Sequence, residues 1–136
     1  MKPGKPLAFG VLRQNKKLIP LVGLPGNPVS ALVAFEQFCR PAIRLMLGHK
    51  FIPRATIKAI LDNDIDNPDG RRIYARSLVY KKNDVYHVSL IGVQSSNILS
   101  AMGKANGLAI CPENKTLVKA GEAVTVMMLY WPSEVF

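Results

Sequence analysis

The hydrophobic pattern of the first 24 residues predicts two neighbouring strands. Apolar runs at Leu7–Leu12 and Leu18–Leu24 flank a polar stretch at residues 13–17, which is typical of a short turn. A loop rich in proline and glycine, residues 23–30, follows the second run. The period of the apolar positions changes at this loop.

The next segment has the period of a helix. Apolar side chains recur every three or four positions from Pro28 to about Leu47, which predicts a long amphipathic helix. Pro41 lies inside it and removes one backbone hydrogen bond, so we expect a kink or a break there, and Gly48 ends the helix. Two strands and one helix cannot bury this much apolar surface alone. We therefore expect residues 1–48 to be a truncated unit or to depend on another chain.

After residue 50 the pattern changes to the alternation of β-strands, interrupted by polar turns. Five strands are expected, and they predict a small antiparallel sheet or barrel: Ala55–Leu61, Arg72–Tyr80, Val85–Ile91, Leu108–Cys111 and Ala123–Trp131. A short helix is expected at Asn97–Lys104, with Gly107 just past its end.

The loop of residues 23–30, Gly-Leu-Pro-Gly-Asn-Pro-Val-Ser, is the first candidate for binding chemistry. Pro28 occupies the expected first helical position and Asn27 precedes it as a side-chain cap. A rigid loop before a helix presents backbone N–H groups and the positive end of the helix dipole, which suits a small anion. The alternative is a well-built connection between a strand and a helix.

Charge strengthens the anion hypothesis and leaves a second one open. The chain is 49% hydrophobic and carries a net charge of +9, and residues 1–50 hold eight Lys or Arg against the single acid Glu36. A local positive field suits a phosphate-bearing or oxyanion ligand, and it also suits nucleic acid. No apolar run approaches the roughly 20 residues that span a bilayer, and no signal-peptide core follows Met1, so we expect a cytoplasmic protein.

Residues that often bind metals are scattered along the chain. Cys39 and Cys111 have no CxxC spacing, which predicts a reduced, buried pair rather than a disulfide or a metal site. His49 and His87 are equally isolated, so we expect no structural metal site. The acidic residues of 62–66 imitate a calcium loop but lack its glycine and its final glutamate, which favours a solvated turn.

Two motifs at this separation carry a family resemblance. Residues 2–10, Lys-Pro-Gly-Lys-Pro-Leu-Ala-Phe-Gly, and residues 23–31 resemble the end of the molybdopterin-binding domain of the MoeA family. This family, the molybdopterin molybdenumtransferases, includes the gephyrin E domain. Residues 92–98 and 107–112 are similar to its C-terminal β domain.

The resemblance implies an enzyme of molybdenum cofactor biosynthesis. Such an enzyme inserts molybdate into adenylylated molybdopterin and releases AMP, with help from Mg²⁺, and works as an elongated homodimer of four-domain chains. The implied fold is an α/β fragment, residues 1–48 at the end of a molybdopterin-binding domain, followed by a mostly antiparallel β-barrel-like domain at residues 49–136. The acidic residues that the family uses around its metal are missing, so we expect no metal ligands here and no catalysis by this polypeptide alone.

The resemblance also assigns residues to the site. Active-site roles fall on Lys2, Arg76 and Ser96, and binding of the pterin and its phosphate falls on Lys5, Pro25, Gly26, Asn27, Pro28 and Ser30. An ammonium neutralises oxyanions as a point charge, a guanidinium offers a planar fork, and a hydroxyl donates one hydrogen bond. Without the family, each lysine is a solvated side chain, Arg76 an outward strand residue and Ser30 a cap.

Two other functions stay open from the residues themselves. One is a freestanding β-domain that binds or interacts, with its basic N-terminal arm docked on a partner such as the rest of a split enzyme. The other is a basic barrel that binds nucleic acid, which is less favoured because no aromatic ladder accompanies the charged strand ends.

Overall fold

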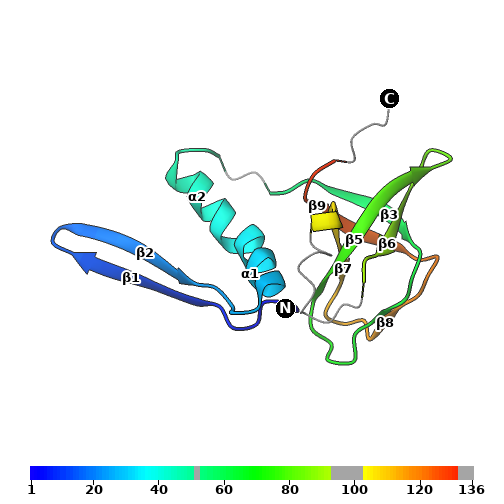
Figure 1. The fold of residues 1–136 in the computed structure, drawn as a ribbon, viewed down its shortest axis with the longest axis horizontal. Coiled ribbons are helices and arrows are strands. Elements are labelled where there is room, and N and C mark those ends of the chain that lie inside the picture. The colour runs from blue at the N-terminus through cyan, green and yellow to red at the C-terminus, as the bar shows by residue number, and fades with distance from the viewer. Residues whose placement is uncertain (51–52, 93–102, 132–136) are drawn as a thin grey trace.

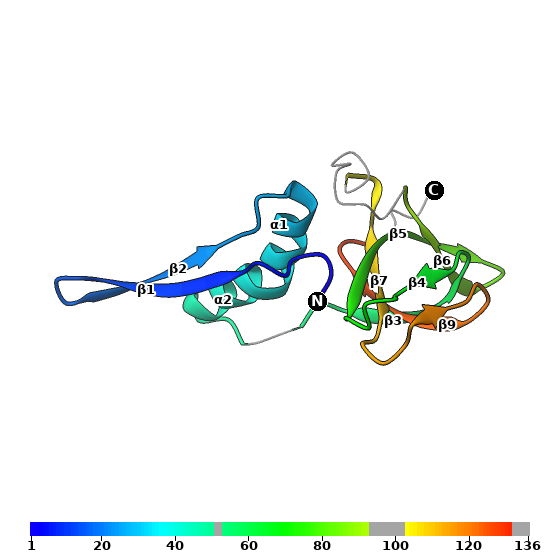
Figure 2. The same ribbon diagram turned by 90° about the horizontal axis from the view of Figure 1, so that it is seen from below.

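The N-terminal strands form a hairpin that projects from the rest of the molecule. The computed structural model describes residues 1–50, 53–92 and 103–131. Strands β1 (Ala8–Gln14) and β2 (Lys17–Gly23) pair antiparallel, from Ala8 opposite Gly23 to Gln14 opposite Lys17. The two expected strands and their short connection are confirmed, although the connection is shorter than the polar stretch suggested. Figures 1 and 2 show the hairpin extending away from the barrel.

The expected helix is continuous but changes its winding ahead of Pro41. It consists of α1 (Pro28–Ala34), a π-helical turn η1 (Phe35–Cys39) and α2 (Arg40–Met46). The Arg40 N–H donates to the carbonyl of Phe35, five residues back. A proline ring clashes with the carbonyl four residues before it, and this wider turn accommodates that ring. Gly48 follows the helix with a φ of +81°, as expected of a C-terminal glycine.

The second half of the chain is a closed barrel of five strands, which agrees with the expected barrel-like domain. The order around the barrel is β3–β6–β5–β7–β9. Four of the neighbouring pairs are antiparallel, and β3 with β6 is parallel. The strand bounds are β3 Thr56–Leu61, β5 Ile73–Lys82, β6 Val85–Leu90, β7 Gly107–Cys111 and β9 Ala123–Met128.

Two very short strands were not predicted from the sequence. Strands β4 (Ile65–Asp66) and β8 (Leu117–Val118) pair antiparallel beside the barrel. Two residues are too few to show an alternation. Most of the short helix expected at 97–104 lies outside the described residues. Its last two residues, Gly103 and Lys104, are described and are helical.

The acidic stretch at residues 62–66 is only partly the expected turn, because its last two residues form strand β4. Asp62 accepts a hydrogen bond of 2.8 Å from the Tyr80 hydroxyl and lies 3.3 Å from His87 Nδ1. Asp64 accepts from the backbone N–H of Ala120 at 2.7 Å. These carboxylates therefore connect the end of β3 to neighbouring elements.

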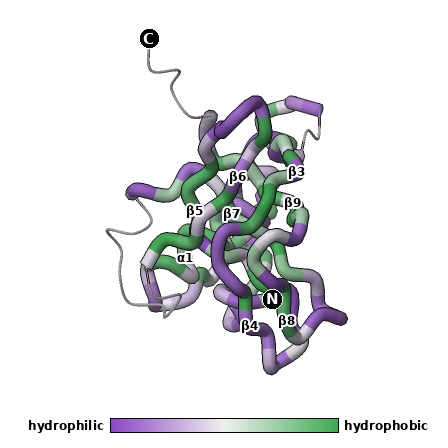
Figure 3. The backbone as a smooth tube through the Cα atoms, turned by 90° about the vertical axis from the view of Figure 1, so that its right-hand side faces the viewer, coloured by the Kyte–Doolittle hydropathy of each residue, from purple (hydrophilic) through white to green (hydrophobic). Residues whose placement is uncertain are grey.

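Alternating apolar residues fill the barrel interior. Figure 3 shows hydrophobic colour along the barrel strands and hydrophilic colour along much of the connecting chain. The buried core includes Leu61, Val79, Val88 and Val126, and Cys111 is buried with them. Cys39 is only partly buried, so the expectation of a buried pair is wrong for that residue, and both cysteines are free thiols. Cys39 sits in the π-helical turn, outside the barrel core.

The helix packs on the outer face of the barrel. Val33 of α1 is fully buried against Leu108 and Met127. An ion pair of 2.7 Å between Arg54 and Glu36 reinforces this contact from the chain that leads into β3. The division into domains at residue 48 stays a prediction. No helix among the described residues is long and apolar enough to cross a membrane.

The other side of the helix and the hairpin expose many large apolar side chains. The most exposed include Phe9 (72%), Leu18 (63%), Met46 (69%) and Leu47 (71%). Exposed apolar surface of this extent is typical of an interaction site. It agrees with the expectation that residues 1–48 need further polypeptide for burial.

Candidate functional site

The N-terminal residues attach to the barrel as a short extra strand. The Lys2 N–H donates to the carbonyl of Arg72 at 2.8 Å, and the Tyr74 N–H donates to the carbonyl of Lys2 at 2.9 Å. On the same edge of β5, the Ile91 N–H donates to the carbonyl of Arg76 at 3.0 Å. Lys2 and Arg76, two residues expected in the site, therefore lie along one edge of one strand.

The same segment also contacts the first turns of α1. Gly4 is buried with a φ of +104°, a conformation that favours glycine. A Cβ atom at this position would lie 3.7 Å from both the Ser30 carbonyl and the Ala34 Cβ. Residues 2–5 thus connect β5 to the helix that follows the Pro-Gly-Asn-Pro loop, although the two motifs are about 20 residues apart in sequence.

Asn27 caps the helix, and this changes the expected role of the loop. Its Oδ1 accepts from the N–H groups of Val29 at 3.0 Å and Ser30 at 3.2 Å, and its carbonyl accepts from Ala31 at 2.8 Å. The expectation that these amides are unpaired and face an anion is therefore wrong, since the cap satisfies them. The capping interpretation is confirmed for Asn27.

The other loop residues differ in exposure. Pro25 is buried, Pro28 is exposed, and Ser30 is 8% exposed beneath the N-terminal segment. Gly26 is exposed, and a Cβ atom there would meet nothing within 4 Å. Gly26 is thus the position where backbone is most open to an approaching ligand.

Arg76 is buried although it points away from the barrel interior. Strand alternation places it on the outer face of β5, opposite Leu108 on β7. Leu108 packs against Val33, so this outer face is covered, and Arg76 is only 2% exposed. Burial lowers the pKa of the Arg76 guanidinium from its usual value, because the charged form loses water. A charge that is held this deep interacts more strongly with an anion than a solvated one.

Lys2 has an acidic neighbour that the sequence did not indicate. Its ammonium lies 3.5 Å from Asp69, whose carboxylate also accepts from Arg71 at 2.8 Å. The hydrogen bond from Arg71 and, after it, the charge of Lys2 lower the pKa of Asp69. The only sequence signal was the Asn-Pro-Asp-Gly turn that carries Asp69, because 67 positions separate it from Lys2. Lys5 is exposed.

The expected site residues are thus partly brought together. Lys2, the start of α1 and Arg76 are linked through β5 and Gly4, whereas Ser96 lies outside the described residues. Within the described ranges, no three His, Cys, Asp or Glu side chains gather in a way that would hold a metal ion. These residues do not supply a ligand set for Mg²⁺.

These features define a small closed β-barrel with a helix packed on its outer face and a β-hairpin beside that helix. The family model described as MoeA C-terminal region (domain IV) matches residues 58–129, which is more than half of the chain. The chain belongs to this family.

Relatives along nearly the whole chain agree. The chain is 36% identical to a molybdopterin molybdenumtransferase of Haemophilus influenzae, over 93% of this chain and 31% of that protein. It is 35% identical to the molybdenum cofactor synthesis protein cinnamon of Drosophila melanogaster, over 95% of this chain and 22% of that protein. The chain thus spans about a third or less of the length of these relatives.

Solved structures show the same fold. A molybdopterin biosynthesis MoeA protein from Pyrococcus horikoshii superposes with a TM-score of 0.67 and 30% identity, over 93% of this chain and 30% of that one. A second structure of MoeA from this organism gives a TM-score of 0.72 at 27% identity.

Proposed function

We propose that this chain is the C-terminal part of a MoeA-type molybdenumtransferase. Residues 1–48 would complete a molybdopterin-binding domain, and residues 49–136 would form the terminal β domain. Support comes from the match to the family's C-terminal region and from relatives about three times as long. The reaction would be insertion of molybdate into adenylylated molybdopterin with release of AMP.

The observation that carries this proposal is the attachment of Lys2 to the strand of Arg76. Both substrates of the proposed reaction carry oxyanions, and two cations on one strand edge suit them. Lys2, half-exposed, would neutralise an arriving oxyanion as a mobile point charge. Arg76, fixed and buried, would hold its planar fork in one orientation. Ser96 would add a hydroxyl donor.

The loop would form one wall of the same pocket, but with a smaller role than the sequence suggested. Because Asn27 already satisfies the amides of α1, the loop's contribution would be shape and backbone approach at Gly26. Pro25 and Pro28 would keep this wall rigid, and Lys5 would add charge beside it. Ser30 lies under the N-terminal segment and would support the wall from behind.

The exposed apolar surface supports the view that this polypeptide is not competent alone. The hairpin and helix expose side chains that a folded domain normally buries, so further polypeptide would cover them. That polypeptide would be the preceding part of the same chain or a separate subunit of a split enzyme. Mg²⁺ ligands would come from it, because the described residues offer no set of them.

The nucleic-acid alternative is less well supported. Arg71 pairs with Asp69 at 2.8 Å and Arg72 with Glu113 at 2.8 Å, so two of the cations at the charged strand ends already have acidic partners. Salt-dependent association with single-stranded nucleic acid would revive this alternative.

The direct test is a titration of this chain with molybdate and with a pterin phosphate, followed by fusion behind the preceding two-thirds of the Haemophilus relative. We expect weak binding and no turnover by the chain alone, and cofactor synthesis by the fusion. Lys2→Ala and Arg76→Gln should each reduce synthesis at least tenfold, whereas Lys82→Ala, an exposed lysine at the end of β5, should not. Productive turnover by the isolated chain would overturn the incompleteness, and full activity of Lys2→Ala would overturn the site.

A further inference from the structure

A cavity of about 320 Å³ lies on the outer face of the barrel, where β3, β9 and β7 run side by side. Its floor is apolar and includes Ile110 and Pro112, and three cations line it, Lys58, Arg72 and Lys115. A hollow of this size, lined by both apolar and charged side chains, is large enough for a small molecule that has an apolar body and an anionic group. The cavity uses neither Lys2 nor Arg76.

One cation in this cavity has an arrangement suited to an anion. Lys58 lies opposite Thr125 across the β3–β9 pair, and its ammonium donates to the Thr125 hydroxyl oxygen at 2.8 Å. Thr125 in turn lies opposite Ile110 on β7. Because the hydroxyl accepts from Lys58, its own proton remains to be donated. Among the described residues, Lys58 has no acidic partner within ion-pair distance.

The two other cations have acidic partners that a ligand can replace. Arg72 pairs with Glu113 and Lys115 pairs with Glu122, each at 2.8 Å. All four side chains are between 41% and 57% exposed. Exposed pairs of this kind contribute little free energy, so an arriving anion competes for these cations at low cost.

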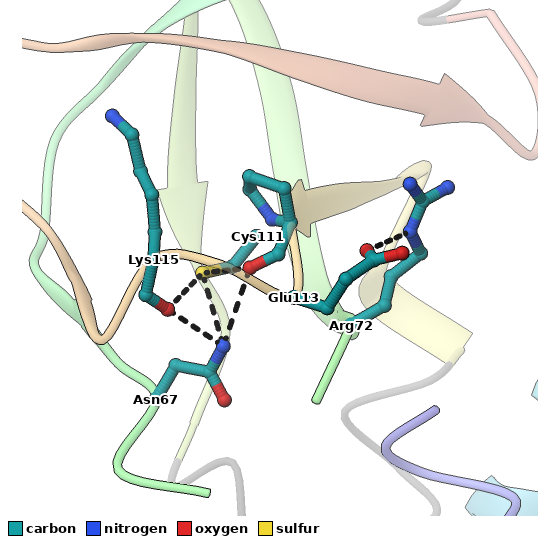
Figure 4. A network of polar contacts seen from close by, with 6 residues as sticks. Asn67, Arg72, Cys111, Glu113 and Lys115 are labelled. Carbon is teal, nitrogen blue, oxygen red and sulfur yellow. Dashed lines mark hydrogen bonds and ion pairs between the residues drawn. The ribbon is translucent and has the colours of Figure 1, made fainter. Parts of the chain in front are cut away.

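One wall of the cavity is held in place from behind. Asn67 is fully buried, and its Nδ2 donates to the carbonyls of Lys115 at 2.8 Å and Pro112 at 3.4 Å. Figure 4 shows the Asn67 amide facing the sulfur of Cys111 and the Lys115 carbonyl, with the pair of Arg72 and Glu113 nearby. A wall fixed before binding loses less entropy when a ligand arrives.

We propose that this cavity binds a small organic anion with an apolar or aromatic body. The body would lie on Ile110 and Pro112, and its phosphate or carboxylate would contact the Lys58 ammonium and the Thr125 hydroxyl. Arg72 and Lys115 would supply a positive field at the mouth of the cavity. This site uses other side chains than the proposed molybdopterin pocket, although Arg72 lies next to Lys2, so its binding can be tested independently of that function.

The test is a titration of the ¹⁵N-labelled chain with phenyl phosphate, inorganic phosphate and molybdate, followed through backbone amide shifts. We expect phenyl phosphate to shift the amides of Lys58, Ala123 and Thr125, with inorganic phosphate binding at least fivefold more weakly because it lacks the body. Removing one charged hydrogen bond by Lys58→Ala should weaken phenyl phosphate about tenfold. Thr125→Val, which keeps the shape, should weaken it about threefold to tenfold.

Lys82→Ala is the matched control, because it removes one exposed lysine of the same barrel at a distance from the cavity. Its affinity should stay within about twofold of the parent chain. Circular dichroism melts should show that the variants fold. Absence of any shift at about 10 mM phenyl phosphate, equal weakening by Lys82→Ala, or shifts centred on Arg76 would each overturn the proposal.

Discussion

The buried side chain of Asn106 gives the sharpest stability prediction, because it hydrogen-bonds to the backbone of β5 at Val79 as a neighbouring strand would. β7 begins at Gly107, so within the described part of the chain no strand pairs with β5 on that side beyond Ser77. Asn106 Oδ1 accepts from the Val79 N–H at 2.7 Å, and its Nδ2 donates to the Val79 carbonyl at 2.9 Å. The residue is 2% exposed and Val79 is 1% exposed. Asn106→Ala therefore leaves two buried backbone groups without partners.

The size of the effect follows from that count. Each buried group left unpaired costs about 1–3 kcal/mol, so the loss of two should lower the free energy of unfolding by about 2–6 kcal/mol. For a chain of this length the melting temperature should fall by roughly 10 °C. Asn106→Asp keeps the acceptor for the Val79 N–H but places a carboxylate beside the Val79 carbonyl, and should destabilise at least as much.

Urea denaturation followed by circular dichroism measures this difference, with Asn63→Ala as the control. Asn63 also makes two side-chain hydrogen bonds, but both are accepted by its Oδ1, from the Ser89 hydroxyl at 3.1 Å and the Leu90 N–H at 3.0 Å, and the residue is exposed. Water replaces both bonds there, so the loss should stay below about 1 kcal/mol. Equal losses for Asn63→Ala and Asn106→Ala would refute the argument that burial sets the cost.

Three further predictions concern other parts of the barrel. Gly107→Ala should lower the free energy of unfolding by about 1–3 kcal/mol, because its Cβ would approach side-chain atoms on two neighbouring strands to 2.8 and 3.0 Å; an unchanged urea midpoint would contradict this. Burial raises the pKa of the Cys111 thiol, so iodoacetamide should modify the partly buried Cys39 first, which mass spectrometry of the native chain detects. The hydrogen bond from Arg72 lowers the pKa of Glu113 in the folded chain. The stability that this pair contributes is therefore present above pH 4.5 and is lost as the pH falls below that value. Glu113→Gln should flatten the decrease in stability at acidic pH, which urea denaturation at several pH values measures.

Much of the fold could be predicted because it depends on local periodicity. The hairpin, the long helix and five barrel strands each follow from an apolar period of two or 3.6. The pairing of β4 with β8 could not be predicted, since two residues carry no period. The parallel contact of β3 with β6 was equally hidden, because it depends on how the barrel closes. The sequence predicted a kink or a break at Pro41, whereas the helix is continuous and has a π-helical turn just before the proline.

The candidate site divides in the same way between local and long-range features. The Asn27 cap could be predicted, because its partners lie two and three residues away. The consequence for the anion was missed, since the cap uses the amides that we assigned to a ligand. Strand alternation placed Arg76 on the outer face correctly, but only tertiary packing shows that this face is covered. The contact of Lys2 with Asp69 spans 67 positions and has no signature in a single sequence.

The helix has two different faces, one packed against the barrel and one that exposes apolar side chains. One face packs on the barrel through Val33, which is fully buried, while the opposite face exposes Phe38 and Met46. A Cβ atom at Gly4 would lie 3.7 Å from the Ser30 carbonyl oxygen and from the Ala34 Cβ, so this segment runs close to α1 beside Val33. The contacts that connect Lys2, the loop and Arg76 therefore all lie on the packed side. Under the proposed function, further polypeptide on the exposed side would bury the apolar residues there and would leave these contacts in place.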